Sequence, residues 1–142
     1  CQEAARYFAP GSITCFDNSD IGAPIASGSF VHDGMVVVPC SMSTLAGIAH
    51  GTSNNLIERA ADVCLKEGRT LVLVPRETPL NLIHLRNMLA AVEAGARMVP
   101  AMPAFYADSS RVSDLVNFMV GKILDSLGID NDSYRRYNRG PE

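Results

Sequence analysis

The sequence has little of what marks nucleic-acid-binding, membrane-spanning or zinc-binding proteins. Its 12 Lys and Arg residues are outnumbered by 15 Asp and Glu residues, so the net charge is -3 and no basic surface for nucleic acid is predicted. No apolar run approaches the length that crosses a membrane. The four cysteines lack C-x-x-C spacing and the three histidines lack metal-ligand spacing, so we expect no zinc site, no other metal and no redox pair.

The motifs of three large enzyme groups are missing as well. There is no G-x-S-x-G, no Walker loop and no G-x-G-x-x-G, so hydrolase, NTPase and dinucleotide-binding functions lack support. The 142 residues are 47% hydrophobic and 19% charged, which is typical of one globular domain with a real core. We expect a cytoplasmic protein with reduced thiols, in which Cys40 and Cys64 pack as small core residues.

Short apolar runs alternate with amphipathic segments along the chain. Runs 34–39, 70–75 and 97–100 predict strands, and 13–16 is a further candidate. Helical spacing is found over 45–49, 54–67, 79–95 and 112–127. Asn54 or Asn55 is expected to cap the second of these helices, and Pro79 to lie in the first turn of the third. The alternation predicts an α/β fold with a parallel sheet flanked by helices.

Three strands are few for a sheet of this kind. A doubly wound domain would add at least one strand–helix unit ahead of residue 1, so we expect an N-terminally incomplete fold. The prediction is one α/β domain over residues 1–128, followed by a polar C-terminal tail over residues 129–142.

The segment VPRETPL places Arg76 and Glu77 directly after the second buried strand. Ligands of open α/β sheets bind at the carboxyl ends of the strands. A guanidinium can bind phosphate or polar ring atoms, and a neighbouring carboxylate can move protons. The alternative interpretation of this pair is a solvated surface ion pair.

The segment PCSMST joins the first strand to a helix and carries Ser41, Ser43 and Thr44. Hydroxyls and free backbone N–H groups at a helix N-terminus suit a phosphate or another anion, and simple N-capping is the equal alternative. Because neighbouring parallel strands end at one edge, this segment and Arg76 are expected to face one crevice.

Three further groups carry candidate side chains with weaker signals. Arg59 and Lys66 are seven residues apart on one helix face, where pairing with Glu58, Asp62 or Glu67 is the alternative. Phe105 and Tyr106 could form an apolar wall for a ligand or belong to the core. Lys122 lies close to the apolar stripe of the last helix, where its stem could instead extend past Phe118 to solvent.

The segments NLIERAADV, VPRETPL and MPAFY, in that order, resemble the UbiX/Pad-type flavin prenyltransferases. The likeness extends from about residue 24 to the final helix. It implies a flavodoxin-like, Rossmann-related fold that binds reduced FMN and needs no metal. It also implies transfer of a dimethylallyl group from dimethylallyl monophosphate to N5 and C6 of the flavin. The prenylated FMN then serves a UbiD-type decarboxylase, and members of this family form dodecamers with sites at subunit interfaces.

The resemblance assigns roles to individual residues. Ser41, Met42, Ser43 and Thr44 would bind FMN, and Arg76 would contact the flavin. Tyr106 and Lys122 would hold the prenyl phosphate. Arg59, Lys66 and Glu77 would complete this phosphate pocket from a neighbouring subunit, with Glu77 passing protons to or from the phosphate.

The sequence departs from the family pattern at its front. The G-A-S-G loop that follows the family's first strand is absent, and so is the second strand. Two other functions therefore remain open. One is a flavin-dependent cysteine decarboxylase of the same fold, although MPAFY occupies the loop where its substrate motif would lie. The other is a non-catalytic flavin-binding subunit.

Overall fold

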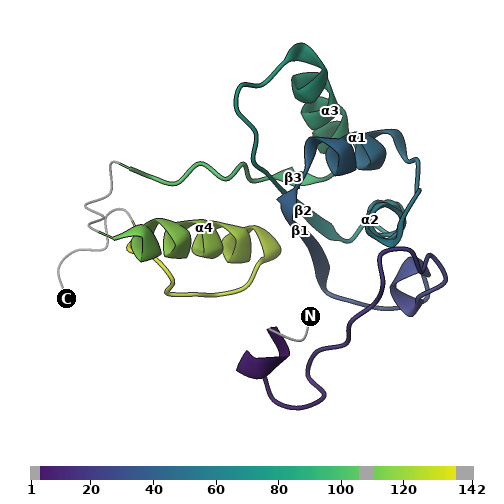
Figure 1. Cartoon of the computed structure of the whole chain (residues 1–142), viewed down its shortest axis with the longest axis horizontal. Helices are drawn as coiled ribbons and strands as arrows, with labels where there is room; N and C mark the ends of the chain where they lie inside the picture. The colour runs from purple at the N-terminus through teal and green to yellow at the C-terminus, as the bar shows by residue number, and fades with distance from the viewer. Residues whose placement is uncertain (1–3, 106–110, 137–142) are drawn as a thin grey trace.

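The computed structural model describes residues 4–105 and 111–136. A parallel sheet of three strands, in the order β1-β2-β3, forms its centre: β1 (Gly34–Cys40), β2 (Thr70–Pro75) and β3 (Arg97–Met98). Helices α1 (Met42–His50) and α2 (Leu56–Lys66) connect β1 to β2, α3 (Leu82–Glu93) connects β2 to β3, and α4 (Val112–Leu127) follows (Figure 1). Two short 3-10 helices, η1 (Ala4–Tyr7) and η2 (Pro24–Ala26), precede β1. The predicted α/β fold with a parallel sheet is confirmed.

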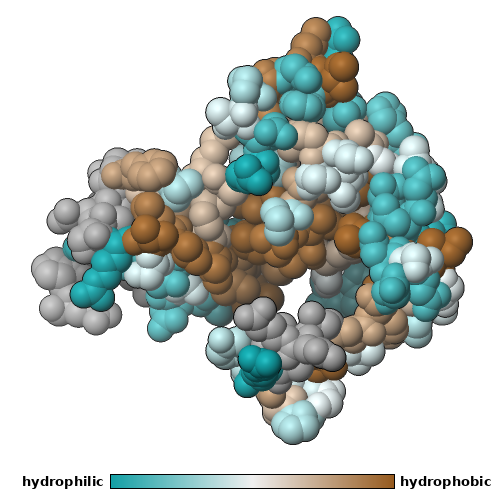
Figure 2. All heavy atoms as spheres, in the orientation of Figure 1, coloured by the Kyte–Doolittle hydropathy of each residue, from teal (hydrophilic) through white to brown (hydrophobic). Residues whose placement is uncertain are grey.

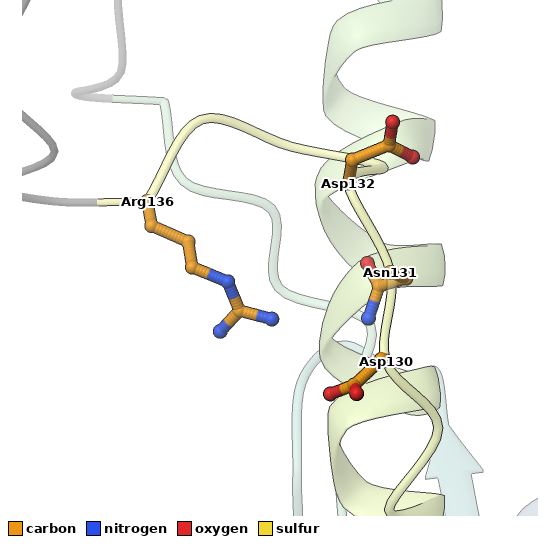
Figure 3. A pocket seen from close by; sticks show the side chains of 4 residues that line it. All are labelled: Asp130, Asn131, Asp132 and Arg136. Carbon is orange, nitrogen blue, oxygen red and sulfur yellow. The ribbon is translucent and has the colours of Figure 1, made fainter.

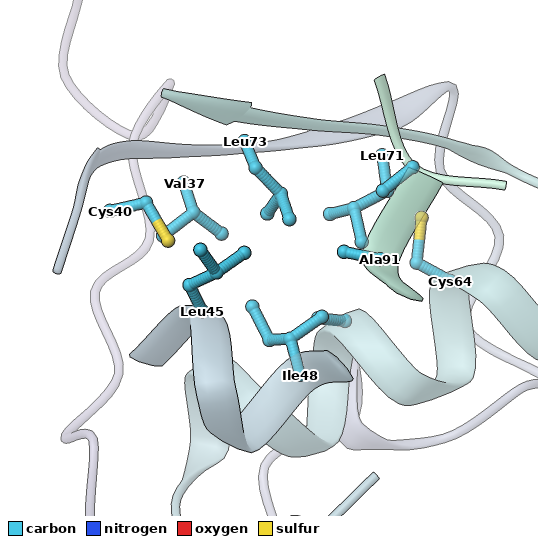
Figure 4. Close-up of a cluster of buried hydrophobic side chains, with 10 residues drawn as sticks. Val37, Cys40, Leu45, Ile48, Cys64, Leu71, Leu73 and Ala91 are labelled. Atoms are coloured by element: carbon cyan, nitrogen blue, oxygen red, sulfur yellow. The ribbon is translucent and has the colours of Figure 1, made fainter. Parts of the chain in front are cut away.

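The two faces of the sheet are covered by different helices. In β2, Leu71 and Leu73 point to one face, where they pack with the first three helices around Leu45 and Ile48 (Figure 4). Val72 and Val74 point to the other face and pack against Ile123 of α4. All four β2 side chains are almost inaccessible to solvent, as expected for a central parallel strand. Helix, sheet and helix therefore form three layers.

Two helices begin at asparagine caps, of which the sequence predicted the one at α2. Asn55 caps α2 by accepting a hydrogen bond from the backbone N–H of Glu58. Asn81 caps α3 in the same way, through the N–H of His84 at 2.9 Å. The prediction that Pro79 lies in the first turn of α3 is wrong, because the Asn81 side chain satisfies the first free N–H groups and α3 begins at Leu82.

Two predicted strands also differ from the structure. Residues 13–16 form no strand, and Phe16 is exposed, so this run has neither a core to cover nor a strand to pair with in the described chain. The third strand is shorter than predicted, since only Arg97–Met98 is regular. The chain nevertheless continues beside β2, because the N–H groups of Val99 and Ala101 donate to the carbonyls of Leu73 and Pro75.

The chain folds back on α4 after that helix ends. The Asp125 carboxylate accepts hydrogen bonds from the Tyr134 hydroxyl at 2.7 Å and from the Arg136 guanidinium, with an ion-pair distance of 2.6 Å. The Tyr134 ring meets Phe118 edge-on and lies against Gly121. The described part of the predicted polar tail is thus attached to α4 by both charge and ring packing.

The cysteines follow the sequence prediction only in part. Cys40 and Cys64 are free and buried, as expected. Burial raises the pKa of the Cys40 thiol to about 11 and raises that of Cys64 as well. The expectation of a reduced thiol is wrong for Cys15, which is disulfide-bonded, because residue spacing does not report which thiols meet in space.

A flavoprotein-type edge at the carboxyl ends of the strands

The carboxyl edge of the sheet brings together the two segments that the sequence singled out. Cys40 and Pro75 are register partners in β1 and β2. Ser41 and Arg76 directly follow the last residues of these strands, so they leave the sheet side by side. The Ala101 N–H donates to the Pro75 carbonyl at 2.9 Å, which brings the segment that leads to Phe105 to the same edge. The predicted convergence of strand ends is therefore present within a single chain.

The first of these segments is organised as a helix cap. The Ser41 Oγ accepts a hydrogen bond from the Thr44 N–H at 3.1 Å and lies 3.0 Å from the Thr44 Oγ1. Met42 packs partly against the core, and Ser43 is exposed. The N-capping interpretation is thus correct. It does not exclude an anion, because the N–H groups of Met42 and Ser43 lie in the first helical turn, before regular i→i−4 bonding begins.

The second segment presents two exposed charged side chains. Arg76 and Glu77 are both exposed, and among the described residues no ion pair joins them. The Glu77 carboxylate instead accepts a hydrogen bond from the Thr78 N–H at 3.1 Å. The surface ion pair that was the alternative interpretation is therefore absent here, and the Arg76 guanidinium remains available at the edge.

Arg59 and Lys66 have local partners in the chain. Arg59 pairs with Asp62 at 3.0 Å, and Lys66 pairs with Glu67 at 3.3 Å. Lys66 is the last residue of α2 and lies shortly before β2 begins. Arg76 directly follows the last residue of β2. A strand of 6 residues is about 20 Å long, so Lys66 lies at the other end of β2. One chain does not bring Lys66 together with Arg76.

One residue of the same helix differs from its predicted position. Glu58 was placed on the charged flank of α2 but is buried, with 6% of its surface exposed. Its carboxylate accepts hydrogen bonds from the Thr52 hydroxyl, the Asn54 N–H and the Asn55 side chain. The spacing of Asn55 and Glu58, three residues apart, was the signal that could have identified this role.

The remaining candidates lie around α4 and beyond β3. Lys122 is exposed on α4, and its ammonium lies 5.8 Å from the centre of the Tyr134 ring. This contact holds the charge on the tail side of the helix. Phe105 is 77% exposed, so it is not a core residue. Tyr106 lies outside the described residues.

A surface hollow lies away from this edge, between α4 and the segment that follows it. It is lined by Asp130, Asn131, Asp132 and Arg136, and the Arg136 side chain extends toward the other three (Figure 3). None of the residues predicted for the site lines it. We place the candidate site at the strand ends, because that is where the ligand-binding segments meet and because this hollow is open and built largely from one turn of the tail.

The described residues contain no group of three or more His, Cys, Asp or Glu side chains placed to hold a metal ion. Within the same residues, none of the helices has the length and apolar character needed to cross a membrane.

An open parallel sheet with a capped helix and an arginine at its carboxyl edge is the ligand-binding arrangement of α/β nucleotide- and flavin-binding proteins. Comparison with known proteins specifies the class further. The family model for Flavoprotein matches residues 12–124. The chain belongs to this flavoprotein family.

Several proteins named UbiX or UbiX-like are more than half identical to this chain. The flavin prenyltransferase UbiX of Alkalihalophilus pseudofirmus is 56% identical over 128 residues, which are 90% of this chain and 64% of the relative. The structure of AnUbiX (PadA1) in complex with FMN and dimethylallyl pyrophosphate is 53% identical, with a TM-score of 0.83 over 88% of this chain and 66% of that one. A dodecameric FMN-dependent UbiX-like decarboxylase from Escherichia coli O157:H7 is 55% identical, with a TM-score of 0.82 over 85% and 65%. The chain thus spans just under two thirds of the length of each of these proteins. The predicted family and its flavodoxin-like fold are confirmed.

Proposed function

We propose that this chain acts as a flavin prenyltransferase. In this reaction, a dimethylallyl group passes from dimethylallyl monophosphate to N5 and C6 of reduced FMN. The observation that carries the proposal is the pairing of Cys40 with Pro75, which places Ser41 and Arg76 side by side at the ligand-binding edge. The relatives that carry the prenyltransferase name support the chemistry, since they are more than half identical to this chain.

The residues at this edge fit a flavin phosphate or ring edge. The N–H groups of Met42 and Ser43 begin α1, and the hydroxyls of Ser43 and Thr44 lie in the same turn. A helix N-terminus of this kind favours negative charge. The Arg76 guanidinium can donate a planar pair of hydrogen bonds to polar atoms of the flavin. When bound, FMN supplies the nucleophilic atoms that accept the prenyl group.

The leaving phosphate needs compensating positive charge. Breaking the allylic C–O bond creates an allyl cation and releases phosphate, so cations around the phosphate lower the barrier. We assign this work to Arg59, Lys66 and Lys122, with Tyr106 as a hydroxyl donor. Glu77 passes a proton to or from the departing phosphate. Phe105, which is exposed in the single chain, shields the cation from water.

This pocket requires more than one copy of the chain. Lys66 lies at the opposite end of β2 from Arg76, so both reach one ligand only if a neighbouring copy contributes one of them. The dodecameric state of the Escherichia coli relative supports such an assembly. We propose the same dodecamer here, in the cytoplasm, with a UbiD-type decarboxylase as recipient of the prenylated FMN.

The test is direct incubation of the purified chain with reduced FMN under anaerobic conditions. One sample receives dimethylallyl monophosphate, a second the pyrophosphate and a third no donor. The proposal expects a flavin product heavier by C5H8 and with altered absorbance in the first sample and not in the third, while the second sample shows whether the pyrophosphate also serves as donor. An unchanged flavin mass in all three would contradict prenyl transfer by this chain. Because the chain is shorter than its relatives, FMN binding is measured separately by fluorescence titration.

The two other candidate functions give distinct results in the same experiment. Carbon dioxide released from a peptide that ends in cysteine would indicate the cysteine decarboxylase. FMN retained without either turnover would indicate a non-catalytic flavin-binding subunit.

A further inference from the structure

The Arg69 side chain joins two parts of the chain that are far apart in sequence. Its guanidinium donates one hydrogen bond to the carbonyl of Phe30 and another to the carbonyl of Gly28, each at 2.7 Å. A planar guanidinium offers two parallel donors, and bonds from a charged donor are shorter and stronger than neutral ones. Arg69 therefore holds the loop that follows η2 against the end of α2.

The backbone of Arg69 is attached to the last turn of α2. Its N–H donates to the carbonyl of Cys64 at 2.9 Å, and the N–H of Gly68 donates to the carbonyl of Leu65 at 3.0 Å. Gly68 has the left-handed backbone, with a φ of 67°, that this helix ending requires. Because its backbone and its side chain bind different segments, Arg69 fixes the loop relative to the end of the helix that carries Lys66.

The loop that Arg69 holds lies directly against the ion pair of Lys66. A methyl group added at Gly28 would fall 2.3 Å from Oε1 of Glu67, so the bare backbone of Gly28 contacts this carboxylate. The same carboxylate oxygen pairs with the Lys66 ammonium at 3.3 Å. A lysine side chain has many rotamers, so a partner that is itself held in place limits the positions of the ammonium.

The start of α2 is held by the same stretch of chain. The Leu56 N–H donates to the Asn18 carbonyl at 2.8 Å, and the Ile57 N–H donates to the Asn18 Oδ1 at 3.0 Å. Helix η2, which lies beside α2 (Figure 1), shares a buried apolar cluster with Leu56. We call residues 18–30 the α2 strap, because they contact both ends of the helix. Figure 2 shows hydrophilic side chains where α2 lies, so the strap leaves the polar face of the helix open.

We propose that Arg69 is a positioning residue of the prenyl-phosphate pocket. It acts on Lys66 through the loop at Gly28 and the Glu67 carboxylate. This inference rests on the proposed function, in which Lys66 offsets the charge of the leaving phosphate. Such a cation must be held close to its working geometry, because small displacements weaken its effect on the transition state. The Arg69 guanidinium is itself engaged with two carbonyls, so it acts through these neighbours and not by contact with the phosphate.

The first test measures Lys66 without any turnover. Lys66 and Lys122 are the only lysines of the sequence, so Lys122 is an internal reference for acetylation of Lys66 by an N-hydroxysuccinimide ester, followed by peptide mass spectrometry. A nitrogen must leave its carboxylate before it can attack the reagent. Arg69→Ala should therefore raise the Lys66 rate relative to Lys122 roughly two- to fivefold, as for the loss of an exposed ion pair. Arg86→Ala removes the same charge from an exposed position on α3 and should leave the ratio unchanged. An unchanged ratio in Arg69→Ala would overturn the proposal.

A glycine variant separates positioning from a loss of stability. Gly28→Ala leaves Arg69 in place, but its new methyl group displaces the Glu67 carboxylate, so it should raise the Lys66 ratio to a similar extent. Gly22→Ala is the matched control within the α2 strap, because its methyl group meets its nearest neighbour only at an ordinary 3.4 Å. Circular dichroism checks that both variants are folded. A folded Gly28→Ala protein with the wild-type ratio would contradict the role of the loop.

A double-mutant cycle tests whether Arg69 acts through Glu67. Glu67→Gln weakens the ion pair directly, so it should raise the Lys66 ratio by itself. The double variant Arg69→Ala/Glu67→Gln should then label no faster than Glu67→Gln, because both changes remove the same contact. Two effects that multiply would show that Arg69 influences Lys66 independently of Glu67, and would overturn the proposal.

The last test uses prenyl transfer. In Arg69→Ala we expect kcat/KM for dimethylallyl monophosphate to fall roughly two- to fivefold, while the dissociation constant of FMN keeps its wild-type value, because Arg76 lies at the other end of β2. An FMN affinity that falls equally would indicate a general loosening of the fold and would count against positioning. If the wild-type chain transfers no prenyl group, the proposed function fails, but the labelling ratios still decide whether Arg69 positions Lys66.

Discussion

The Glu58 carboxylate lies directly against the α-carbon of Gly47. A methyl group added at Gly47 would fall 2.4 Å from Glu58 Cδ. The carboxylate cannot easily move aside, because it is buried and accepts hydrogen bonds from Thr52, Asn54 and Asn55. Glycine at this position therefore allows α1 to approach the turn that begins α2.

The first prediction concerns this contact. In an exposed helix, replacing glycine by alanine stabilises by up to about 1 kcal/mol. At Gly47 we expect the opposite, a loss of about 1–3 kcal/mol, because the methyl group overpacks the buried carboxylate. Urea denaturation of Gly47→Ala measures it. Gly22→Ala is the control, since its new methyl would meet Asp20 only at an ordinary 3.4 Å. A Gly47→Ala protein as stable as wild type would show that Glu58 is free to move.

The second prediction concerns the contact between α4 and the tail. A methyl at Gly121 would lie 2.2 Å from Tyr134 Cδ1, so Gly121→Ala should displace the ring from α4. The bonds of Tyr134 and Arg136 to Asp125 are then lost together. We expect trypsin to cleave after Arg135 and Arg136 several times faster, with α4 itself intact. Val120→Ala, on the exposed side of the same helix, should keep the wild-type cleavage rate.

Acid should release the same tail. Hydrogen bonds from Tyr134 and then Arg136 hold the pKa of Asp125 at about 2, below the ordinary 3.8. A carboxylate with a lowered folded pKa stabilises the attached state fully above the unfolded value and loses this contribution as the pH falls toward the folded one. The tail should therefore detach between about pH 4 and about pH 2. The side-chain amide NMR signals of Asn131, which donates to Asp125 at 2.9 Å, report the transition. Asp125→Asn should remove this pH dependence.

The buried thiols should be unreactive in the folded protein. With a pKa near 11, the Cys40 thiol carries roughly 100-fold less thiolate at neutral pH than one at the ordinary 9.0, and burial also blocks access. Iodoacetamide should label Cys40 and Cys64 peptides slowly in native protein and rapidly in urea, as followed by mass spectrometry. Rapid labelling of the native protein would mean that the core around β1 opens readily.

Variants of Glu77 and Arg76 should affect prenyl transfer and FMN binding separately. We expect Glu77→Gln to retain FMN and lose prenyl transfer, because the amide cannot exchange a proton with the leaving phosphate. Arg76→Ala should instead weaken FMN binding by about 1.5–3 kcal/mol, typical of a lost hydrogen bond to a charged group. Flavin fluorescence titration and product mass measure the two effects. Wild-type turnover by Glu77→Gln would remove its assigned role, and an unchanged FMN affinity in Arg76→Ala would remove that of the arginine.

Much of the fold and part of the site follow from local sequence patterns. The run of residues 70–75 predicted a buried strand because apolar side chains on both faces suit only a covered sheet. The convergence of Ser41 and Arg76 also followed, because parallel strands end at a common edge. The start of α3 was misplaced because two signals, Pro79 and Asn81, compete within three residues. The spacing of Asn55 and Glu58 indicated a cap, but the burial of Glu58 was missed because two of its partners, Thr52 and Asn54, belong to the loop between two helices.

The sequence by itself determined which three apolar runs form the sheet and which polar segments follow the first two of them. These are local properties, since periodicity and caps depend on residues a few positions apart. Only the tertiary structure decided that Arg69 reaches the carbonyls of a distant loop and that Lys66 lies a strand's length from Arg76. It also decided that Tyr134 returns to α4. These facts depend on which segments meet in space, and the spacing of residues along the chain does not report which distant segments meet.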